Sequence, residues 1–483
     1  MGQVQNMPGK FEDKLKTVVE KESGLRREMK GRHIFMITLG GVIGTGLFLS
    51  TGFTINQAGP GGTVLAYALG GLIMYLVMLC LGELAVAMPV AGAFQTYARE
   101  FINPGTGFMI GWFFWLNGAT TIGVELTAAA IIIKNFIPGV SEWVWVLLFG
   151  IILFSVNALS VKNFGEMEFW FAGIKVAAII AAIVVGAGVI LGFNGHPALG
   201  AQNYTGHGGL FPKGLSAVIL AMITVAFSYN GTEIIGIAAG ESDNPEKTIP
   251  RSVNGTAVRT LLFYVLAIVV LVGIIPWQTA GVKDSPFADI FMAAGFNWGR
   301  TLMDFVVLTS ALSCCNSWIY SATRILWAMA CEGNAPRFLG RLSKKAVPVN
   351  SLYATALVAA LALLTSVISA DKVYVWLLAL CGLAGVIDWM GICASQFFFR
   401  REYIASGGRV ENLKYRTPLY PLVPIAGFLF NLGIAVSLAF VPDQRLALIT
   451  GVPFAIFLVV YYNYFVKPKR AGNYAPAADS PVK

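Results

Sequence analysis

Long apolar segments alternate with short polar loops along almost the whole chain. A run of about 20 apolar residues is long enough to cross a bilayer as a helix. The pattern therefore predicts an all-α polytopic membrane protein with 12 transmembrane helices. Composition agrees, since 56% of the 483 residues are hydrophobic and only 12% are charged, whereas soluble domains carry about 25%. The predicted spans cover 34–59, 62–88, 106–135, 143–160, 167–192, 214–240, 256–278, 300–329, 349–369, 373–399, 420–441 and 446–466.

Lysine and arginine are divided unevenly between the predicted loops. Loops on the same side as the N-terminus hold most of the 34 basic residues, and such residues concentrate on the cytoplasmic side of a membrane. We therefore expect a multi-pass protein of the cell (inner or plasma) membrane with both termini in the cytoplasm. Residues 1–33 and 467–483 would be cytoplasmic tails. This loop bias accounts for the net charge of +9, so no nucleic-acid partner is expected.

Two predicted spans are interrupted in a similar way. The first contains the segment 40–46 (GGVIGTG), and the sixth contains 227–233 (FSYNGTE). Their offset by five helices predicts a 5+5 inverted repeat, with 34–192 as the first repeat, 214–399 as the second and 420–466 as two peripheral helices. Interrupted segments at corresponding places in two halves point to a transporter binding site.

Broken helices at membrane depth have a physical consequence. They leave backbone N–H and C=O groups that must find partners in the absence of water. A zwitterionic amino acid could satisfy both kinds, because its carboxylate accepts and its ammonium donates hydrogen bonds. The alternative is that glycine-rich segments only allow close helix packing.

Ionisable residues inside the predicted spans are candidates for function, because burying them in a membrane is costly. Glu233 follows the second interruption and could hold the broken helix, bind substrate or bind a proton. Glu125 lies in the outer half of the third span and Asp388 in the middle of the tenth, where it could titrate or stay neutral and hydrogen-bonded. Glu83 and Asp304 lie near span ends, which favours interfacial anchoring or a local hydrogen bond.

Lys175 lies about two turns into the fifth span. A buried lysine can lose its proton, so Lys175 is a candidate for proton coupling. The alternative is a fixed ion pair with Glu166 or Glu168 on the same helix.

Other functional classes find little support. The three histidines, at positions 33, 196 and 207, make no catalytic or metal cluster with the cysteines, so we expect no metal, no cofactor and no enzyme activity. No Walker motif is present, which argues against an ATP-driven pump. A channel would need a filter of repeated carbonyls or charged rings, and none is evident.

Several strings of residues resemble those of a known family. They are Gly40–Phe48 (GGVIGTGLF), Gln57–Pro60 (QAGP), Leu81–Ala85 (LGELA), Met88-Pro89, Glu168–Val176 (EFWFAGIKV) and Gly231–Pro250 (GTEIIGIAAGESDNPEKTIP). On these strings the chain resembles amino acid permeases of the amino acid–polyamine–organocation superfamily over nearly its whole length. It looks most like bacterial arginine/ornithine, lysine and S-methylmethionine permeases.

The resemblance implies a LeuT-like fold and roles for individual residues. Lys175 matches a lysine that replaces a sodium ion in proton-driven relatives, and Glu125 matches an acidic position of cationic-substrate relatives. Glu233 belongs to the GTE string, which also occurs in relatives with neutral substrates. Asp388 and Asp304 depart from the pattern of the relatives. The implied substrate-binding residues are Val42, Ile43, Gly44, Thr45, Gly46, Glu125, Phe227, Asn230, Gly231 and Glu233, and the implied proton-coupling residues are Lys175, Glu233 and Asp388.

The residues and the resemblance together predict a secondary active permease. The expected activity is proton-coupled import of a cationic L-amino acid, lysine or arginine/ornithine, by alternating access. The alternative is a permease for S-methylmethionine or a neutral amino acid. Expected partners are the amino acid, the proton and the lipid bilayer; the oligomeric state, including a weak homo-oligomer, is left open.

Overall fold

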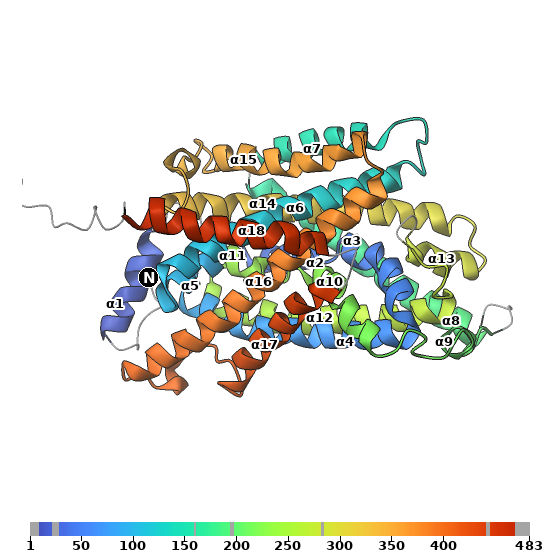
Figure 1. Cartoon of the computed structure of the whole chain (residues 1–483), viewed down its shortest axis with the longest axis horizontal. Helices are drawn as coiled ribbons and strands as arrows, with labels where there is room; N and C mark the ends of the chain where they lie inside the picture. The colour runs from blue at the N-terminus through green and yellow to red at the C-terminus, as the bar shows by residue number, and fades with distance from the viewer. Residues whose placement is uncertain are drawn as a thin grey trace, which may run out of the picture.

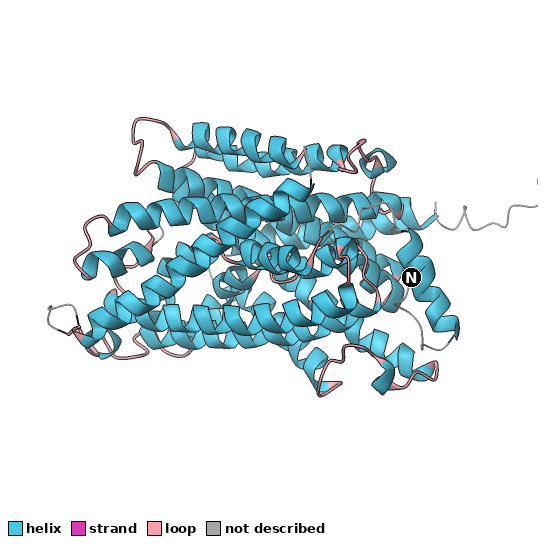
Figure 2. Cartoon of the chain, turned by 180° about the vertical axis from the view of Figure 1, so that it is seen from behind, coloured by secondary structure: helices cyan, strands magenta, loops and turns pink. Residues whose placement is uncertain are grey.

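The chain folds as a bundle of helices. The computed structural model describes residues 9–21, 29–158, 161–193, 198–281, 285–440 and 445–468. Within these ranges the regular structure is helical, with one isolated bridge between Met29 and Ser242 (Figure 2). The all-α prediction is therefore confirmed for the described residues. Most of the predicted terminal tails and His196 lie outside them.

The α-helices differ greatly in length, and several short ones lie between the long ones. They are α1 (Gly9–Lys21), α2 (Gly31–Val42), α3 (Thr45–Phe48), α4 (Ser50–Ala87), α5 (Ala93–Phe101), α6 (Pro104–Ile133), α7 (Glu142–Asn157), α8 (Val161–Leu191), α9 (Gln202–Thr205), α10 (Ser216–Tyr229), α11 (Ile234–Ala238), α12 (Pro245–Ile274), α13 (Pro286–Ala293), α14 (Gly299–Cys331), α15 (Val349–Ala359), α16 (Ala370–Ala405), α17 (Leu422–Ser437) and α18 (Arg445–Tyr461).

Ten described helical segments are long and apolar enough to cross a membrane. Two more, Ile34–Phe48 and Glu142–Asn157, are apolar but shorter. This pattern supports a multi-pass membrane protein, while the count of twelve spans and the inverted repeat stay predictions.

The long helices lie side by side along the molecule, with α1 and α5 at one end and α9 and α13 at the other (Figure 1). Helix α6 packs against α14 and α16, and α4 packs against α10 and α12. In the most apolar 18-residue stretch of α6, 89% of the residues are buried. In the corresponding stretch of the segment Arg445–Val466, which contains α18, only 17% are buried. Exposed apolar side chains such as Leu357, Leu429 and Phe457 line the outer helices, as expected of a surface that faces lipid.

Helix α4 contains the junction between the first two predicted spans, 34–59 and 62–88. Gly59 has φ 74° and ψ 178°, which interrupts the helical conformation. Glycine adopts this positive φ without steric cost, and a Cβ atom here would lie 2.6 Å from the ring of Pro212. The part of α4 before Gly59 is therefore the last part of the first predicted span, and the part after Gly59 is the second predicted span.

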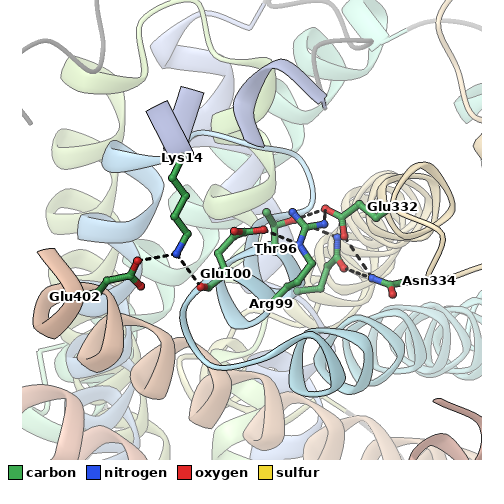
Figure 3. A network of polar contacts seen from close by, with 8 residues as sticks. Lys14, Thr96, Arg99, Glu100, Glu332, Asn334 and Glu402 are labelled. Carbon is green, nitrogen blue, oxygen red and sulfur yellow. Dashed lines mark hydrogen bonds and ion pairs between the residues drawn. The ribbon is translucent and has the colours of Figure 1, made fainter. Parts of the chain in front are cut away.

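A polar network joins the elements at the α1 end of the bundle (Figure 3). Lys14 of α1 donates to Glu402 at 2.7 Å and to the carbonyl of Glu100 at 3.1 Å. Glu332 accepts from Thr96 at 3.0 Å and pairs with Arg99. These contacts tie the N-terminal helix and α5 to the ends of α14 and α16.

Candidate functional site

The first interruption separates α2 from α3. Ile43 has φ −80° and ψ 87°, and Gly44 has φ −127° and ψ −153°, so both leave the helical conformation. Glycines 40, 41 and 44 weaken the helix locally. Gly44 is also needed for space, because a Cβ atom there would lie 2.7 Å from the sulfur of Cys314. The predicted break in the first span is confirmed.

At the interruption, four backbone carbonyls lose the hydrogen bond that each would accept from the residue four positions later in a continuous helix. The N–H of Gly44 donates to the carbonyl of Val42 at 3.0 Å instead of to that of Gly40. Each freed carbonyl accepts a hydrogen bond from a side chain of another helix, as the absence of water in a membrane requires. The pairs are Lys175 Nζ to Gly40 (2.8 Å), Cys314 Sγ to Gly41 (3.1 Å), Tyr264 Oη to Val42 (3.0 Å) and Ser310 Oγ to Ile43 (2.9 Å).

Glu125 of α6 lies at the start of α3. The backbone N–H of Thr45 donates to Oε1 of Glu125 at 3.2 Å and to Oε2 at 3.3 Å. The Glu125 side chain is 1% exposed. The hydroxyl of Thr45 is buried and has no hydrogen-bond partner among the described residues. The carboxylate of Glu125 thus accepts from the N–H of Thr45. From the sequence, we expect a ligand's carboxylate to accept from a backbone donor of this kind.

The second interruption separates α10 from α11 and lies against the first. Asn230 is extended, with φ −63° and ψ 140°, and Gly231 has φ 104°. A Cβ atom on Gly231 would lie 2.7 Å from the carbonyl carbon of Gly41. The hydroxyl of Ser228 donates to the carbonyl of Gly46 at 2.7 Å. Two segments almost 190 residues apart therefore meet with their backbones in contact.

Glu233 closes the second interruption from within. One of its oxygens, Oε2, accepts from the N–H of Gly231 at 3.1 Å, from Nε1 of Trp389 at 3.1 Å and from the hydroxyl of Thr232 at 3.4 Å. The other oxygen, Oε1, is buried with no partner among the described residues. The sequence leaves three roles open for Glu233: holding the broken helix, binding substrate or binding a proton. Its hydrogen bonds to Gly231 and Thr232 fit the first of these roles.

Asp388 belongs to a polar cluster between α6, α10 and α16. The amides of Asn117 and Asn230 donate to each other at 2.8 and 3.3 Å, and Nδ2 of Asn117 also donates to Oδ2 of Asp388 at 3.4 Å. Sequence reasoning missed Asn117, although an asparagine two turns before Glu125 in an apolar run was a usable signal. Trp389, which contacts Glu233, was missed because an aromatic residue in an apolar span carries no such signal.

Phe227 lies beside both interruptions. A Cβ atom on Gly46 would lie 3.4 Å from the ring of Phe227. The ring also borders a void, too small to hold a water molecule, together with Asn230, Gly382, Gly385, Val386 and Trp389. Phe227 therefore lies close to Gly46 of the first segment and to Asn230 of the second.

Two other buried acidic residues, Glu83 and Asp304, contact residues outside the two interruptions. Glu83 accepts from Nε of Arg400 and from the N–H of Thr417, both at 2.6 Å, so it makes a long-range ion pair rather than an interfacial anchor. Asp304 accepts from Asn135 at 3.0 Å. The carboxylates considered as partners of Lys175, at 166 and 168, have side chains outside the described set. No group of three metal-ligating side chains occurs among the described residues.

Comparison with known proteins agrees with this architecture. The family model described as amino acid permease matches residues 33–473. The chain is 52% identical to the amino-acid permease RocC of Bacillus subtilis (strain 168), over 92% of this chain and 96% of RocC. It is 49% identical to RocE of the same organism, over 93% and 97% of the two chains. It is 43% identical to the lysine-specific permease LysP of Escherichia coli (strain K12), over 93% and 95%. With its apolar helices and paired interruptions, the chain belongs to the amino acid permease family.

Proposed function

We propose that this permease imports a cationic L-amino acid, lysine or arginine/ornithine, together with a proton. The observation that carries the proposal is the close pairing of two broken helices, with Lys175 and Glu125 on freed backbone groups of the first and Glu233 on the second. Lys175 and Glu125 can each gain or lose a proton. Both contact the backbone of the first interruption, where we propose that the zwitterionic end of the amino acid binds. The substrate would bind there, and the two predicted repeats would rock to expose it to either side in turn.

Binding would replace internal hydrogen bonds by bonds to the substrate. The substrate carboxylate would take the N–H of Thr45 from Glu125, and the displaced Glu125 carboxylate would neutralise the substrate ammonium. The unpartnered hydroxyl of Thr45 would gain a partner in this exchange. The proposed binding residues are Val42, Ile43, Gly44, Thr45, Gly46, Glu125, Phe227, Asn230, Gly231 and Glu233.

Lys175 would couple transport to the proton. Its ammonium donates to the carbonyl of Gly40 at 2.8 Å, so its protonation state would set how strongly this carbonyl of the first interruption is held. Glu233 and Asp388 are the other proposed proton-coupling residues, because each is fully buried. A proton taken up by any of them would change the charge balance around the substrate.

The substrate assignment has a rival within the same family. Similarity to a lysine-specific permease and the buried carboxylates favour a cationic substrate. An S-methylmethionine or neutral amino-acid permease would use the same backbone contacts, so only the side-chain specificity would differ. We further propose twelve spans and cytoplasmic termini in the cell membrane, in accord with the basic loops.

Uptake of radiolabelled amino acids into proteoliposomes tests the proposal. With an imposed inward proton gradient, lysine or arginine should accumulate, and collapsing the gradient should stop the accumulation. A competition panel of neutral and S-methylated amino acids would separate the rival substrates. Uptake that is indifferent to the gradient would contradict proton coupling, and the absence of any lysine or arginine uptake would contradict the substrate class.

A further inference from the structure

Two buried carboxyl groups lie near the second interruption with unused acceptor capacity. Oε1 of Glu233 and Oδ1 of Asp388 are the buried carboxylate oxygens that have no hydrogen-bond partner among the described residues. Both side chains are 0% exposed. Leaving a buried polar atom unpaired is unfavourable, and more so for a charged group. Glu233 lies at the second interruption, and Asp388 is connected to the same interruption through Asn117 and Asn230, so a cation bound there could donate to both atoms.

The other buried acids in the described ranges are supplied with donors. Glu83 is paired with Arg400, and Glu241 accepts from Nε of Arg324 at 3.1 Å. Both oxygens of Glu125 accept from Thr45. Glu233 and Asp388 instead accept from uncharged donors, which are an indole, an amide, a hydroxyl and a backbone N–H. Among the described residues, neither carboxyl group is therefore paired with a base.

We propose that Glu233 and Asp388 form a second subsite, which binds the distal cation of a dibasic amino acid while the interrupted backbone binds its zwitterionic end. This inference rests on the proposed function and adds which carboxylates recognise the side chain. A lysine ammonium carries three donors and a guanidinium carries five. Either cation would offset one of the two negative charges and donate to both unused oxygens, and charge-assisted bonds of this kind are about twice as strong as neutral ones.

The spacing along α6 suits such a substrate. Asn117, which contacts Asp388, precedes Glu125, which contacts Thr45, by eight residues, a rise of about 12 Å along the helix. An extended lysine spans roughly 8 Å from carboxylate to ammonium by ordinary bond lengths. Hydrogen bonds of about 3 Å at each end make up the difference. An extended lysine is thus long enough to reach both levels, and each methylene group removed from the side chain shortens that reach.

Packing is close around the residues that contact the two carboxyl groups, so a bound side chain would have to displace them. The void bordered by Phe227, Gly382 and Gly385 lies next to Trp389 and Asn230. A Cβ atom on Gly385 would lie 3.2 Å from the amide of Asn230, so the glycine keeps α16 close to the amide pair. Opening that pair would widen the void and offer its amide oxygens to the cation as well.

Binding of matched charged and uncharged ligands tests the subsite. Arginine and citrulline have similar shapes but differ in charge, as do lysine and norleucine. Calorimetric titration of the purified full-length protein would give the affinity ratio within each pair. In Asp388→Asn and Glu233→Gln we expect the arginine-to-citrulline ratio to fall about tenfold or more, as loss of a charge-assisted bond implies. Asp304→Asn removes a buried acid away from the site and should leave the ratio unchanged.

A ratio that is unchanged in Asp388→Asn, with both ligands still bound, would overturn the subsite and leave the permease proposal intact. A wild-type protein that binds neither lysine nor arginine would overturn both. If either variant fails to fold, the affinities of the wild-type protein for diamino acids of decreasing length still test the subsite. Its affinity should decrease steadily from lysine to ornithine to 2,4-diaminobutyrate, and equal affinity for all three would contradict a distal cation site.

Discussion

The N–H of Thr45 donates to both carboxylate oxygens of Glu125, at 3.2 and 3.3 Å, where α3 begins after the first helix break. The two residues are 80 positions apart in sequence. This contact satisfies a backbone donor that has no helical partner. It also marks where a ligand carboxylate would compete, so Glu125 acts at the backbone end of the proposed site.

Replacing Glu125 by glutamine should weaken every amino-acid substrate. The variant keeps an oxygen for the N–H of Thr45 but loses the charge that would neutralise the substrate ammonium. Hydrogen bonds to charged groups contribute about 1.5–3 kcal/mol, so we expect affinity to fall about tenfold or more. Calorimetric titration would measure it.

The size of the effect should be the same for charged and uncharged side chains. Lysine and norleucine serve as the comparison, because both present the same zwitterionic end. A loss confined to lysine would place Glu125 beside the distal cation and would contradict the assignment to the backbone end.

Lys175→Gln should separate transport from binding. Glutamine retains an N–H that can donate to the carbonyl of Gly40 but cannot titrate. We expect substrate exchange across the membrane to persist while accumulation driven by a proton gradient is lost. Proteoliposome uptake with and without the gradient measures both. Equal loss of exchange and accumulation would point to a structural role for Lys175.

The sequence locates the helix breaks because glycine and polar residues interrupt apolar runs at both places. It identifies Lys175 and Glu233 because charge within such a run is exceptional. It does not reveal that Tyr264, Ser310 and Cys314 complete the first break. These contacts join helices far apart in the chain, and nothing in the local pattern of one helix specifies its neighbour.

Glu83 illustrates the same limit. Its place near a span end favours an interfacial anchor or a local hydrogen bond, but the folded chain buries it against Arg400, 317 positions away. Only the packing of α16 beside α4 brings the two charges together. Likewise, Asp388 is recognisable from sequence as a buried charge, but its contact with Asn117 is not.

Gly231→Ala should abolish transport. Gly231 has φ 104°, and an added Cβ would press against the backbone of Gly41. Backbone strain of this kind costs about 1–3 kcal/mol, and the clash would also separate the two breaks. Uptake activity and melting temperature of the purified variant would measure the effect.

Gly433→Ala is the matched control for that substitution. Gly433 lies in α17, and a Cβ atom there would meet nothing within 4 Å. Alanine in a helix interior is favoured over glycine by about 1 kcal/mol, so the control should be fully active and at least as stable. Similar activities of the two variants would contradict the need for the close approach at Gly231.

Arg400→Met should lower stability strongly. The substitution leaves the Glu83 carboxylate buried without its base, which costs about 3–5 kcal/mol. Lys134→Met removes the more exposed pair with Glu142, and exposed pairs contribute about 0–1 kcal/mol. Melting temperatures in detergent should therefore fall far more for Arg400→Met, and equal decreases would mean that the buried pair contributes little.

A structure of the protein with lysine bound is the decisive measurement. We expect the lysine carboxylate within hydrogen-bond distance of the N–H of Thr45, with Glu125 displaced toward the ammonium and both helices still interrupted. Lysine bound elsewhere, with Glu125 still on the N–H of Thr45, would contradict this expectation.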